Sequence, residues 1–230
     1  MKRPKSLLRK TLSALLLVFP VMLSAQGVEL WEIEAESIDT HLEFREDTIE
    51  IWTSAGLTLW RRQPMSVPFV ITYEAMVCQR ETTDRLSDLN CFWLATDPSV
   101  PDGSVFARMD ERRGIFGRAA TLQLYYMGYG GNWNTTTRFR RYNAEPQPPL
   151  LVEYTDSAHL LQPNHWYSIR IEATSARTRY YIDGQLLVDY TDPNPLLHGW
   201  FGFRTTWSHC LLRRFRVDSP TLGRVVRYRL

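Results

Sequence analysis

Lysine is absent from the chain after residue 10, so every later basic side chain is an arginine. An arginine side chain carries a planar fork that binds a carboxylate through two hydrogen bonds. The bias therefore reflects either recognition of carboxylates or the general composition of the source. The sequence also lacks a glycine-rich phosphate loop, zinc-ligand spacing and a Gly-x-Ser-x-Gly turn, and these absences argue against nucleotide, zinc and serine-hydrolase chemistry of the usual kinds.

Cysteine is scarce as well, with only Cys78, Cys91 and Cys210 in 230 residues. An odd number leaves a spare thiol if Cys78 and Cys91, which are close in sequence, form a disulfide. The alternative is that all three are buried as small apolar side chains. We favour buried thiols, and the spacing of the three suggests no metal site.

The first 25 residues have the three parts of a signal peptide. An apolar run over Leu12–Leu23 is followed by the small pair Ser24-Ala25, a suitable cleavage point. The run is shorter than the roughly 20 apolar residues of a membrane anchor. The basic residues that precede it are Lys2, Arg3, Lys5, Arg9 and Lys10. We expect residues 1–25 to be removed, no membrane span to remain, and a periplasmic or secreted domain over residues 26–230.

Removal of this segment changes the charge of the protein. The count of Lys and Arg falls from 27 to 22 against 25 Asp and Glu, which leaves a net charge of about −3. A nucleic-acid-binding domain needs a concentrated basic surface. We therefore expect no nucleic-acid partner.

Short alternating strands dominate the rest of the chain, and no sustained helical period occurs. Over Phe69–Cys78, apolar side chains alternate with polar or smaller ones, the period of a strand with one buried face. Asp183-Gly184 joins two such runs and favours a tight hairpin turn with positive φ. A dozen or so strands separated by Pro, Gly and Asn predict an all-β fold, an antiparallel β-sandwich. Asp97–Arg118, rich in Pro and Gly, is expected to be a long surface loop.

Three segments carry a resemblance to a known superfamily. They are GLTLWRRQPMSVPFVITYEAMV (Gly56–Val77), NHWYSIRIEATSARTRYYIDGQLLVDY (Asn164–Tyr190) and GWFGFRTTWSHCLLRRFRV (Gly199–Val217). Together they resemble the concanavalin A-like lectin/glucanase jelly rolls. Their order is similar to that in uncharacterised secreted bacterial families associated with pectin and rhamnogalacturonan degradation. The resemblance implies a jelly-roll sandwich with a glycan groove on a concave sheet, and a polysaccharide or oligosaccharide partner.

Candidate groove residues come from strand faces that combine arginine with aromatic or amide side chains. Along Gly199–Arg204, alternation places Phe201 and Phe203 toward the core and Trp200 and Arg204 on the other face. Aromatic rings stack on the apolar faces of sugars, and arginines suit uronate carboxylates. The predicted substrate-binding set is Gln123, Asn132, Asn134, Arg138, Arg140, Tyr142, Trp200, Trp207, Asp88 and Asn90.

Lyases of this fold class, on the same resemblance, cleave uronate-linked chains by β-elimination. The reaction needs a group that neutralises the carboxylate, a base for the C5 proton and an acid for the leaving oxygen. The candidate catalytic residues are His209, Tyr125, Tyr129 and Arg204.

Non-catalytic glycan binding on the same face is the alternative. A third interpretation is a structural sandwich whose exposed aromatics form a protein interface. The sequence does not indicate the oligomeric state.

Acidic residues provide a weaker catalytic alternative. Glu32, Glu34 and Glu36 alternate along one segment, as the paired carboxylates of a retaining glycosidase could, but we favour the solvated face of an edge strand. No acidic calcium loop is visible, although the fold admits a structural calcium ion. We therefore expect no cofactor and no metal site.

Overall fold

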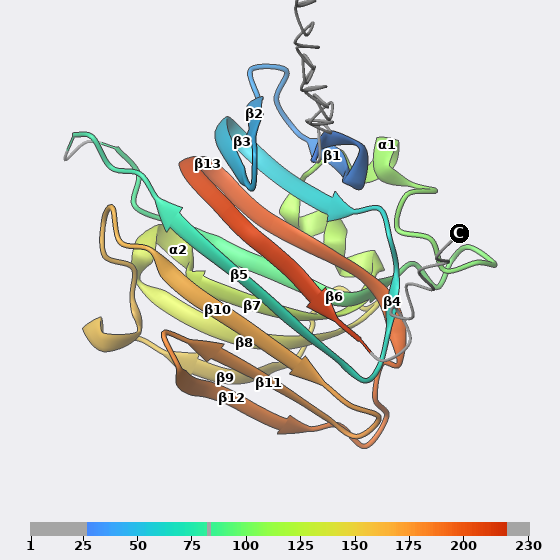
Figure 1. The fold of residues 1–230 in the computed structure, drawn as a ribbon. Helices are drawn as coiled ribbons and strands as arrows, with labels where there is room; N and C mark the ends of the chain where they lie inside the picture. The colour runs from blue at the N-terminus through green and yellow to red at the C-terminus, as the bar shows by residue number, and fades with distance from the viewer. Residues whose placement is uncertain (1–26, 82–83, 220–230) are drawn as a thin grey trace, which may run out of the picture.

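The computed structural model describes residues 27–81 and 84–219, which form an antiparallel β-sandwich of the expected all-β class (Figure 1). The strands are β1 (Trp31–Ala35), β2 (His41–Arg45), β3 (Thr48–Arg61), β4 (Met65–Ser66), β5 (Phe69–Val77), β6 (Leu89–Thr96), β7 (Gln123–Gly130), β8 (Thr136–Asn143), β9 (Leu150–Tyr154), β10 (Tyr167–Ala173), β11 (Arg177–Ile182), β12 (Gln185–Thr191) and β13 (His198–Asp218). The short helices are η1 (Val28–Leu30), α1 (Met109–Arg112), η2 (Phe116–Thr121), α2 (Gly131–Asn134) and η3 (Ser157–His159).

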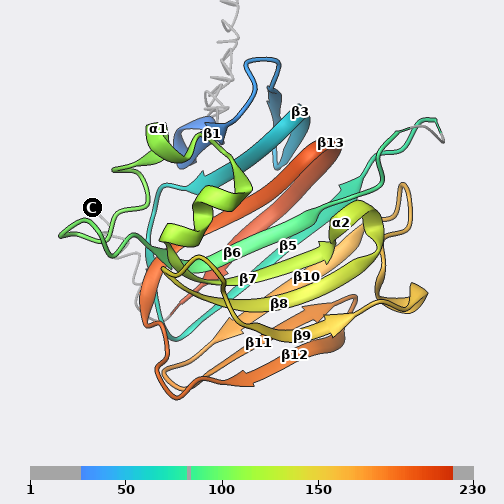
Figure 2. The same cartoon turned by 180° about the vertical axis from the view of Figure 1, so that it is seen from behind.

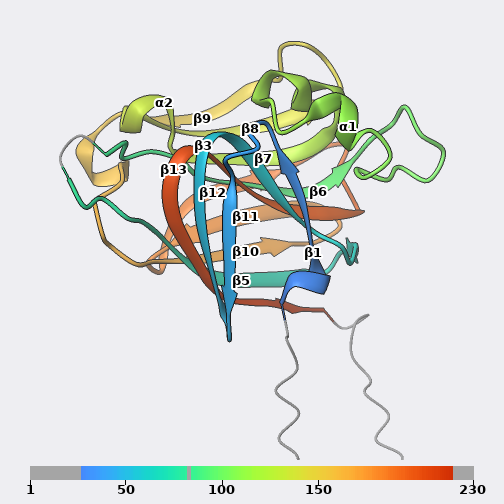
Figure 3. The ribbon, with the colours of Figure 1, turned by 90° about the horizontal axis from the view of Figure 1, so that it is seen from above.

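Two layers face each other across the core. The strand order is β12-β11-β10-β5-β13-β6-β7-β8-β9, with β3 added beside β13. Strand β13 belongs to both layers, because it pairs with β6 over Trp200–Arg204 and with β5 over Cys210–Asp218. Figures 1 and 2 show β5 and β10–β12 on one side and β6–β9 on the other, and Figure 3 shows the two layers from above. We call the layer formed by β13, β6, β7, β8 and β9 the groove layer.

The main core lies between the layers and follows the predicted alternation. On β5, Phe69, Ile71 and Tyr73 are buried together with the other odd-numbered residues of the strand. Phe201 and Phe203 of β13 are fully buried in the same cluster, as expected from their alternation with Trp200 and Arg204. The hairpin prediction is also confirmed, since Asp183 and Gly184 have φ angles of 49° and 79°.

A second, smaller core lies on the outer face of the groove layer. The connection between β6 and β7 carries α1 and η2 and packs Val105 and Ala119 against outward-facing rings of the sheet such as Phe92. Arg112 of this connection is buried and forms an ion pair with Glu34 of β1, with 2.9 Å between Nη2 and Oε2. The predicted long loop over Asp97–Arg118 is therefore a packed segment that covers part of the sheet (Figure 2).

Several details differ from the sequence-based predictions. The strand predicted over Gly199–Arg204 is only the first part of the long strand β13, and β3 runs without interruption through Ala55. The polar segment Asn132–Thr137 contains most of α2 and the start of β8. Cys78, Cys91 and Cys210 are buried and free, as favoured. No helix within the described ranges is long and apolar enough to cross a membrane. The predicted signal peptide lies outside those ranges.

Candidate functional site

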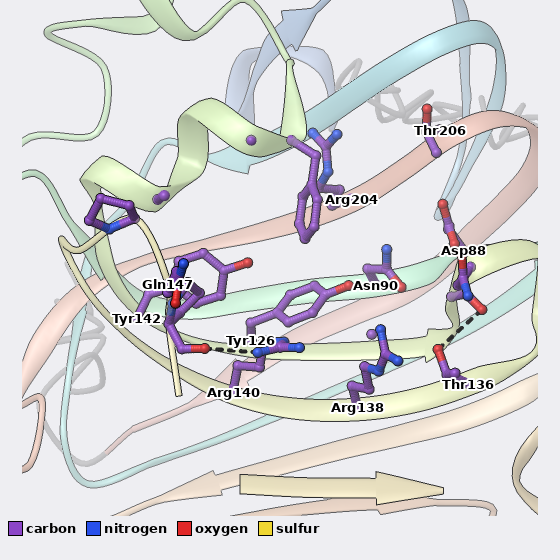
Figure 4. A pocket seen from close by; sticks show the side chains of 18 of the residues that line it. Asp88, Asn90, Tyr126, Thr136, Arg138, Arg140, Tyr142, Gln147, Arg204 and Thr206 are labelled. Carbon is purple, nitrogen blue, oxygen red and sulfur yellow. Dashed lines mark hydrogen bonds between the residues drawn. The ribbon is translucent and has the colours of Figure 1, made fainter. Parts of the chain in front are cut away.

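A groove of about 890 Å³ crosses the outer face of the groove layer, on β13, β6, β7 and β8. One wall comes from η2 and another from the segment that follows β8. The groove is lined by Glu36, Asp88, Asn90, Phe116, Gly117, Ala120, Tyr126, Gly128, Gly131, Asn132, Thr136, Arg138, Arg140, Tyr142, Pro146, Gln147, Pro148, Arg204 and Thr206. Figure 4 shows how the main side chains among them project into this space.

Strand register explains why residues so distant in sequence share the groove floor. Arg204 pairs with Asn90, Asn90 with Gly128, and Gly128 with Arg138. Opposite residues of antiparallel neighbours point to the same face of a sheet. A single row therefore crosses four strands, and the neighbouring row brings Tyr126 beside Arg140.

Arg204 is the most buried cation of the groove floor, with 3% of its surface exposed. Its Nη1 donates to Thr58 Oγ1 at 3.1 Å and to the Gly114 carbonyl at 2.9 Å, and its guanidinium lies 5.0 Å from the centre of the Phe116 ring. No carboxylate of the described chain lies within 4.0 Å of it. Burial lowers the pKa of the side chain, because a low dielectric disfavours the charged form. The charges of Asp88 and Glu34 oppose this shift from beyond ion-pair distance. An anion bound in the groove would add a counter-charge in direct contact.

Asn90 lies directly beside Arg204 in the same row and is 5% exposed. Its Oδ1 is buried without a hydrogen-bond partner in residues 27–81 or 84–219. A buried polar group without a partner costs about 1–3 kcal/mol of stability.

Tyr126 occupies the centre of the floor, and its hydroxyl points toward Asn90 (Figure 4). The ring can lie flat along the sheet because the next outward position on β7 is Gly128. A Cβ at Gly128 would meet the Tyr126 hydroxyl at 2.3 Å. Burial, followed by the nearby charge of Asp88, raises the pKa of Tyr126 well above its usual value. The hydroxyl is therefore neutral at physiological pH and able to donate a hydrogen bond.

The fourth strand of the floor, β8, adds two more arginines. Arg138 is half-exposed and pairs with Glu153, with Nε and Oε1 2.5 Å apart. Arg140 donates from Nη1 to the Pro148 carbonyl at 2.8 Å, and no ion pair to it occurs in the described part of the chain. Tyr142 lies on the same face, and burial raises its pKa to about 12 although Arg140 and Arg204 oppose the shift. Arg140 and Arg204 are thus two cations without acidic partners in one groove.

The acidic side chains of the groove already have partners. Asp88 accepts from Ser87 Oγ at 2.6 Å and pairs with Arg85 at 3.2 Å. Glu36 Oε2 accepts from the Gly56 amide at 3.0 Å. The amide donor is neutral, so Glu36 keeps its negative charge, but Arg140 and Arg204 together exceed it and the net charge facing a ligand is positive.

Half of the predicted site residues line this groove. They come from five strands or connections and belong to both predicted sets: Asp88, Asn90, Asn132, Arg138, Arg140, Tyr142 and Arg204. Whether any of them contacts a substrate stays a prediction.

The predicted placement of Tyr125 and Tyr129 in the groove is wrong. Both are 2% exposed and belong to the core between the layers. Tyr125 donates to Asp192 at 2.6 Å, and Tyr129 packs on Tyr167. Alternation separates the two faces of β7 correctly but does not tell which one turns inward. The outward face carries Tyr126.

His209 is also outside the groove. It follows a bulge in β13 between Thr206 and Ser208, at the point where the strand leaves β6 and begins to pair with β5. Its ring stacks on Trp52, and its Nε2 lies 2.9 Å from Glu50 Oε1. A role for His209 as a base in the groove is therefore not supported by its position.

Four further predicted binding residues do not line the groove. Gln123 shares the inward face of β7 with Tyr125, and the amide of Asn134 is engaged by the backbone of Leu161. Trp200 lies under the β6–β7 connection, where its indole packs against Phe106. Trp207 stands exposed beyond Thr206, just outside the groove.

Sequence analysis also missed residues. Tyr126 and Phe116 line the groove and pack against each other with ring centres 5.4 Å apart. The glycine two positions after Tyr126 was the available signal, since a strand interior rarely tolerates glycine without a reason. Nothing in the local pattern around Phe116 distinguishes it from other loop residues.

The alternating glutamates have structural contacts that differ from the expected solvated edge. Glu34 is buried and accepts from the Trp60 indole at 2.9 Å as well as from Arg112. Glu32 pairs with Arg62 at the surface. A retaining glycosidase needs two free carboxyl groups on one groove, and only Glu36 of the three lines it.

Within the described ranges, no group of three or more His, Cys, Asp or Glu could hold a metal ion. The predicted lack of a cofactor stays a prediction.

Comparisons with known proteins agree with the fold. Residues 51–215 match the family model described as "Domain of unknown function (DUF6250)". No curated protein matches the sequence. A Bacillus subtilis protein of unknown function with a galectin-like fold is similar, with a TM-score of 0.65, 15% identity, and 83% of this chain and 90% of that chain covered.

Two other solved structures have the same fold. The carbohydrate-binding module CBM66 from Bacillus subtilis has a TM-score of 0.56 at 12% identity, with 83% and 96% of the two chains covered. A prokaryotic β-1,3-1,4-glucanase (lichenase) derived from a mouse hindgut metagenome has a TM-score of 0.50 at 10% identity, with 83% and 92% covered. These similarities confirm the concanavalin A-like jelly roll, and they show the fold alone.

Proposed function

We propose, from the premise that the chain belongs to the family described as "Domain of unknown function (DUF6250)", that its groove binds an acidic polysaccharide. The observation that supports this proposal best is Arg204, a buried cation on the groove floor for which the described chain offers no carboxylate partner. A uronate carboxylate would neutralise it in a place where water competes weakly.

Other groups of the groove fit a sugar ligand. Asn90 adds a polar amide to the floor beside Arg204, and Tyr126 and Phe116 offer apolar ring surface. Arg140 gives a second cation, one row along and three strands across from Arg204. The names of two structures with this fold, a carbohydrate-binding module and a glucanase, agree with a carbohydrate ligand. Export from the cell, predicted from the first 25 residues, would place the protein where such polymers occur.

Retardation in gels that contain polygalacturonate tests the proposal. We expect the wild type to be retarded and Arg204→Gln to lose affinity by about thirtyfold or more, since loss of a buried charge partner costs about 2–5 kcal/mol. Arg140→Gln, at a more exposed position, should weaken binding without any risk to folding. Arg216→Gln is the matched control, because Arg216 is an exposed arginine on the same strand as Arg204 but far from the groove. Equal retardation of all four proteins would contradict the proposal.

Elimination at the uronate is a second candidate. With His209, Tyr125 and Tyr129 elsewhere, the hydroxyls in the groove are those of Tyr126 and Tyr142, next to Arg204 and Asn90 as neutralising groups. The raised pKa values of Tyr126 and Tyr142 suit donation of a proton to the leaving oxygen better than removal of the C5 proton. We therefore place binding first. Ultraviolet absorbance of the unsaturated product, followed in the same samples, separates the two. Retardation without absorbance would leave binding alone.

A further inference from the structure

Two exposed tryptophans stand together at one end of the groove. Trp133 of α2 is 61% exposed and Trp207 of β13 is 56% exposed. Their ring centres are 5.4 Å apart, with the planes at 81°. The preceding residues, Asn132 and Thr206, line the groove itself, so the pair directly continues it.

The backbone at both tryptophans is held in an unfavourable conformation. Trp133 has a φ angle of 61° and Trp207 one of 42°. Positive φ is uncommon for a bulky side chain, and such strain persists only where the surrounding structure enforces it. The side chain of Asn134 fixes α2 through hydrogen bonds of 2.7 and 2.9 Å to the backbone of Leu161, and the β13 bulge falls at Trp207. The fold therefore holds two large rings exposed to solvent at the cost of backbone strain.

Arg85 connects the pair to the groove. Its guanidinium lies 5.1 Å from the centre of the Trp133 ring and donates to the Thr206 carbonyl and to Asp88. Because both ends of this contact are fixed, Trp133 cannot easily rotate onto the protein surface. The charge of Arg85 is already matched by Asp88, so this end presents apolar ring surface in place of a free cation.

We infer that Trp133 and Trp207 form a sugar-stacking subsite that extends the groove beyond Thr206. The inference rests on the proposed function, because the platform would hold the apolar C–H face of a residue in the same polysaccharide chain. Trp207 follows Arg204 by three residues, about 10 Å along the strand. A single sugar is therefore too short to contact both Arg204 and the tryptophans.

Titration of the single variants Trp133→Ala and Trp207→Ala with oligogalacturonides of different length tests this subsite. Both side chains are largely exposed, so we expect the variants to fold. Affinity for an octasaccharide should fall by about five- to tenfold in each, whereas affinity for the single sugar galacturonic acid should not change. Leu197→Ala, which truncates an exposed apolar side chain away from the groove, is the control and should bind like the wild type.

The outcomes distinguish failure of the subsite from failure of the proposed function. If the wild type binds the octasaccharide through Arg204 but both tryptophan variants bind it equally well, the subsite is wrong and the groove remains. If the wild type binds no oligogalacturonide, the proposed function fails first. If light scattering shows a wild-type dimer that either variant converts to a monomer, with binding unchanged, the tryptophans form an interface between copies and the inference is overturned.

Discussion

At the scale of single residues, the groove depends on side chains that are missing as much as on those present. Gly128 leaves room for the Tyr126 ring, whose hydroxyl would otherwise meet a Cβ at 2.3 Å. Arg204, Asn90 and Arg138 stand in the same row as this glycine, so the space above it is the centre of the floor. A residue without a side chain thus shapes the site.

Gly128→Ala should displace Tyr126 and weaken polygalacturonate binding by about two- to tenfold, the range expected for loss of one aromatic contact. Gly117→Ala is the matched control, since Gly117 lines the same groove but an added Cβ has no atom within 4 Å. Affinity measured for the two variants by titration checks the expectation. A larger loss for Gly117→Ala than for Gly128→Ala would contradict this account of the floor.

Residue types and alternation along strands were enough to identify some of the groove residues from the sequence, but not to decide which face of every strand turns outward. Arg204, Arg138 and Arg140 were identified because each alternates along its strand with an apolar residue, Phe203 or Phe139, which points to the other face. Tyr125 and Tyr129 were misplaced because the two faces of β7 are almost equally aromatic. The choice between them depends on which layer supplies the covering strands, and that is a property of long-range pairing.

At the scale of elements, the connection between β6 and β7 is an ordered wall of the groove. Arg112 anchors it through the 2.9 Å ion pair with Glu34 and lies 3.6 Å from Asp97, with all three side chains buried. Gly114 follows at φ 68° and brings its carbonyl to Arg204. The segment Arg112–Gly114 therefore links the buried ion pair with Glu34 to Arg204 on the groove floor.

Glu34→Gln should lower the free energy of unfolding by about 3 kcal/mol, because it leaves the charge of Arg112 only partly compensated in the interior. Glu32→Gln removes the neighbouring surface ion pair with Arg62 and should cost less than about 1 kcal/mol. Urea denaturation of both variants measures the difference. Similar losses in the two would show that the buried pair does not hold the connection.

The contrast between Glu32 and Glu34 also marks a limit of sequence analysis. Alternation on a short strand put both on one face and predicted that this face was solvated. The partner of Glu34 is 78 residues away, in a segment with no regular pattern, so no local signal could predict its burial. Predictions succeeded for β5 and the Asp183-Gly184 turn, where the determinants are local.

At the scale of the whole molecule, β13 determines how the two layers and the site are connected. Its first part carries Arg204 in the groove layer, and its last part pairs with β5 in the other layer. The bulge at Trp207 lies between these parts, where the groove ends. The resemblance noted for Gly199–Val217 thus covers the strand that joins fold and candidate site.

The most direct test of the central claim is calorimetric titration of the wild-type protein with polygalacturonate and with the same polymer after methyl esterification of its carboxyl groups. The two polymers share ring shape and ring hydroxyls, and the ester differs in carrying an uncharged methyl carboxylate in place of each carboxylate anion. We predict measurable heat and saturable binding for the acid form, weakened by added salt, and at least tenfold weaker binding for the ester. Equal affinity for the two polymers, or binding of the ester alone, would contradict recognition of a carboxylate by Arg204.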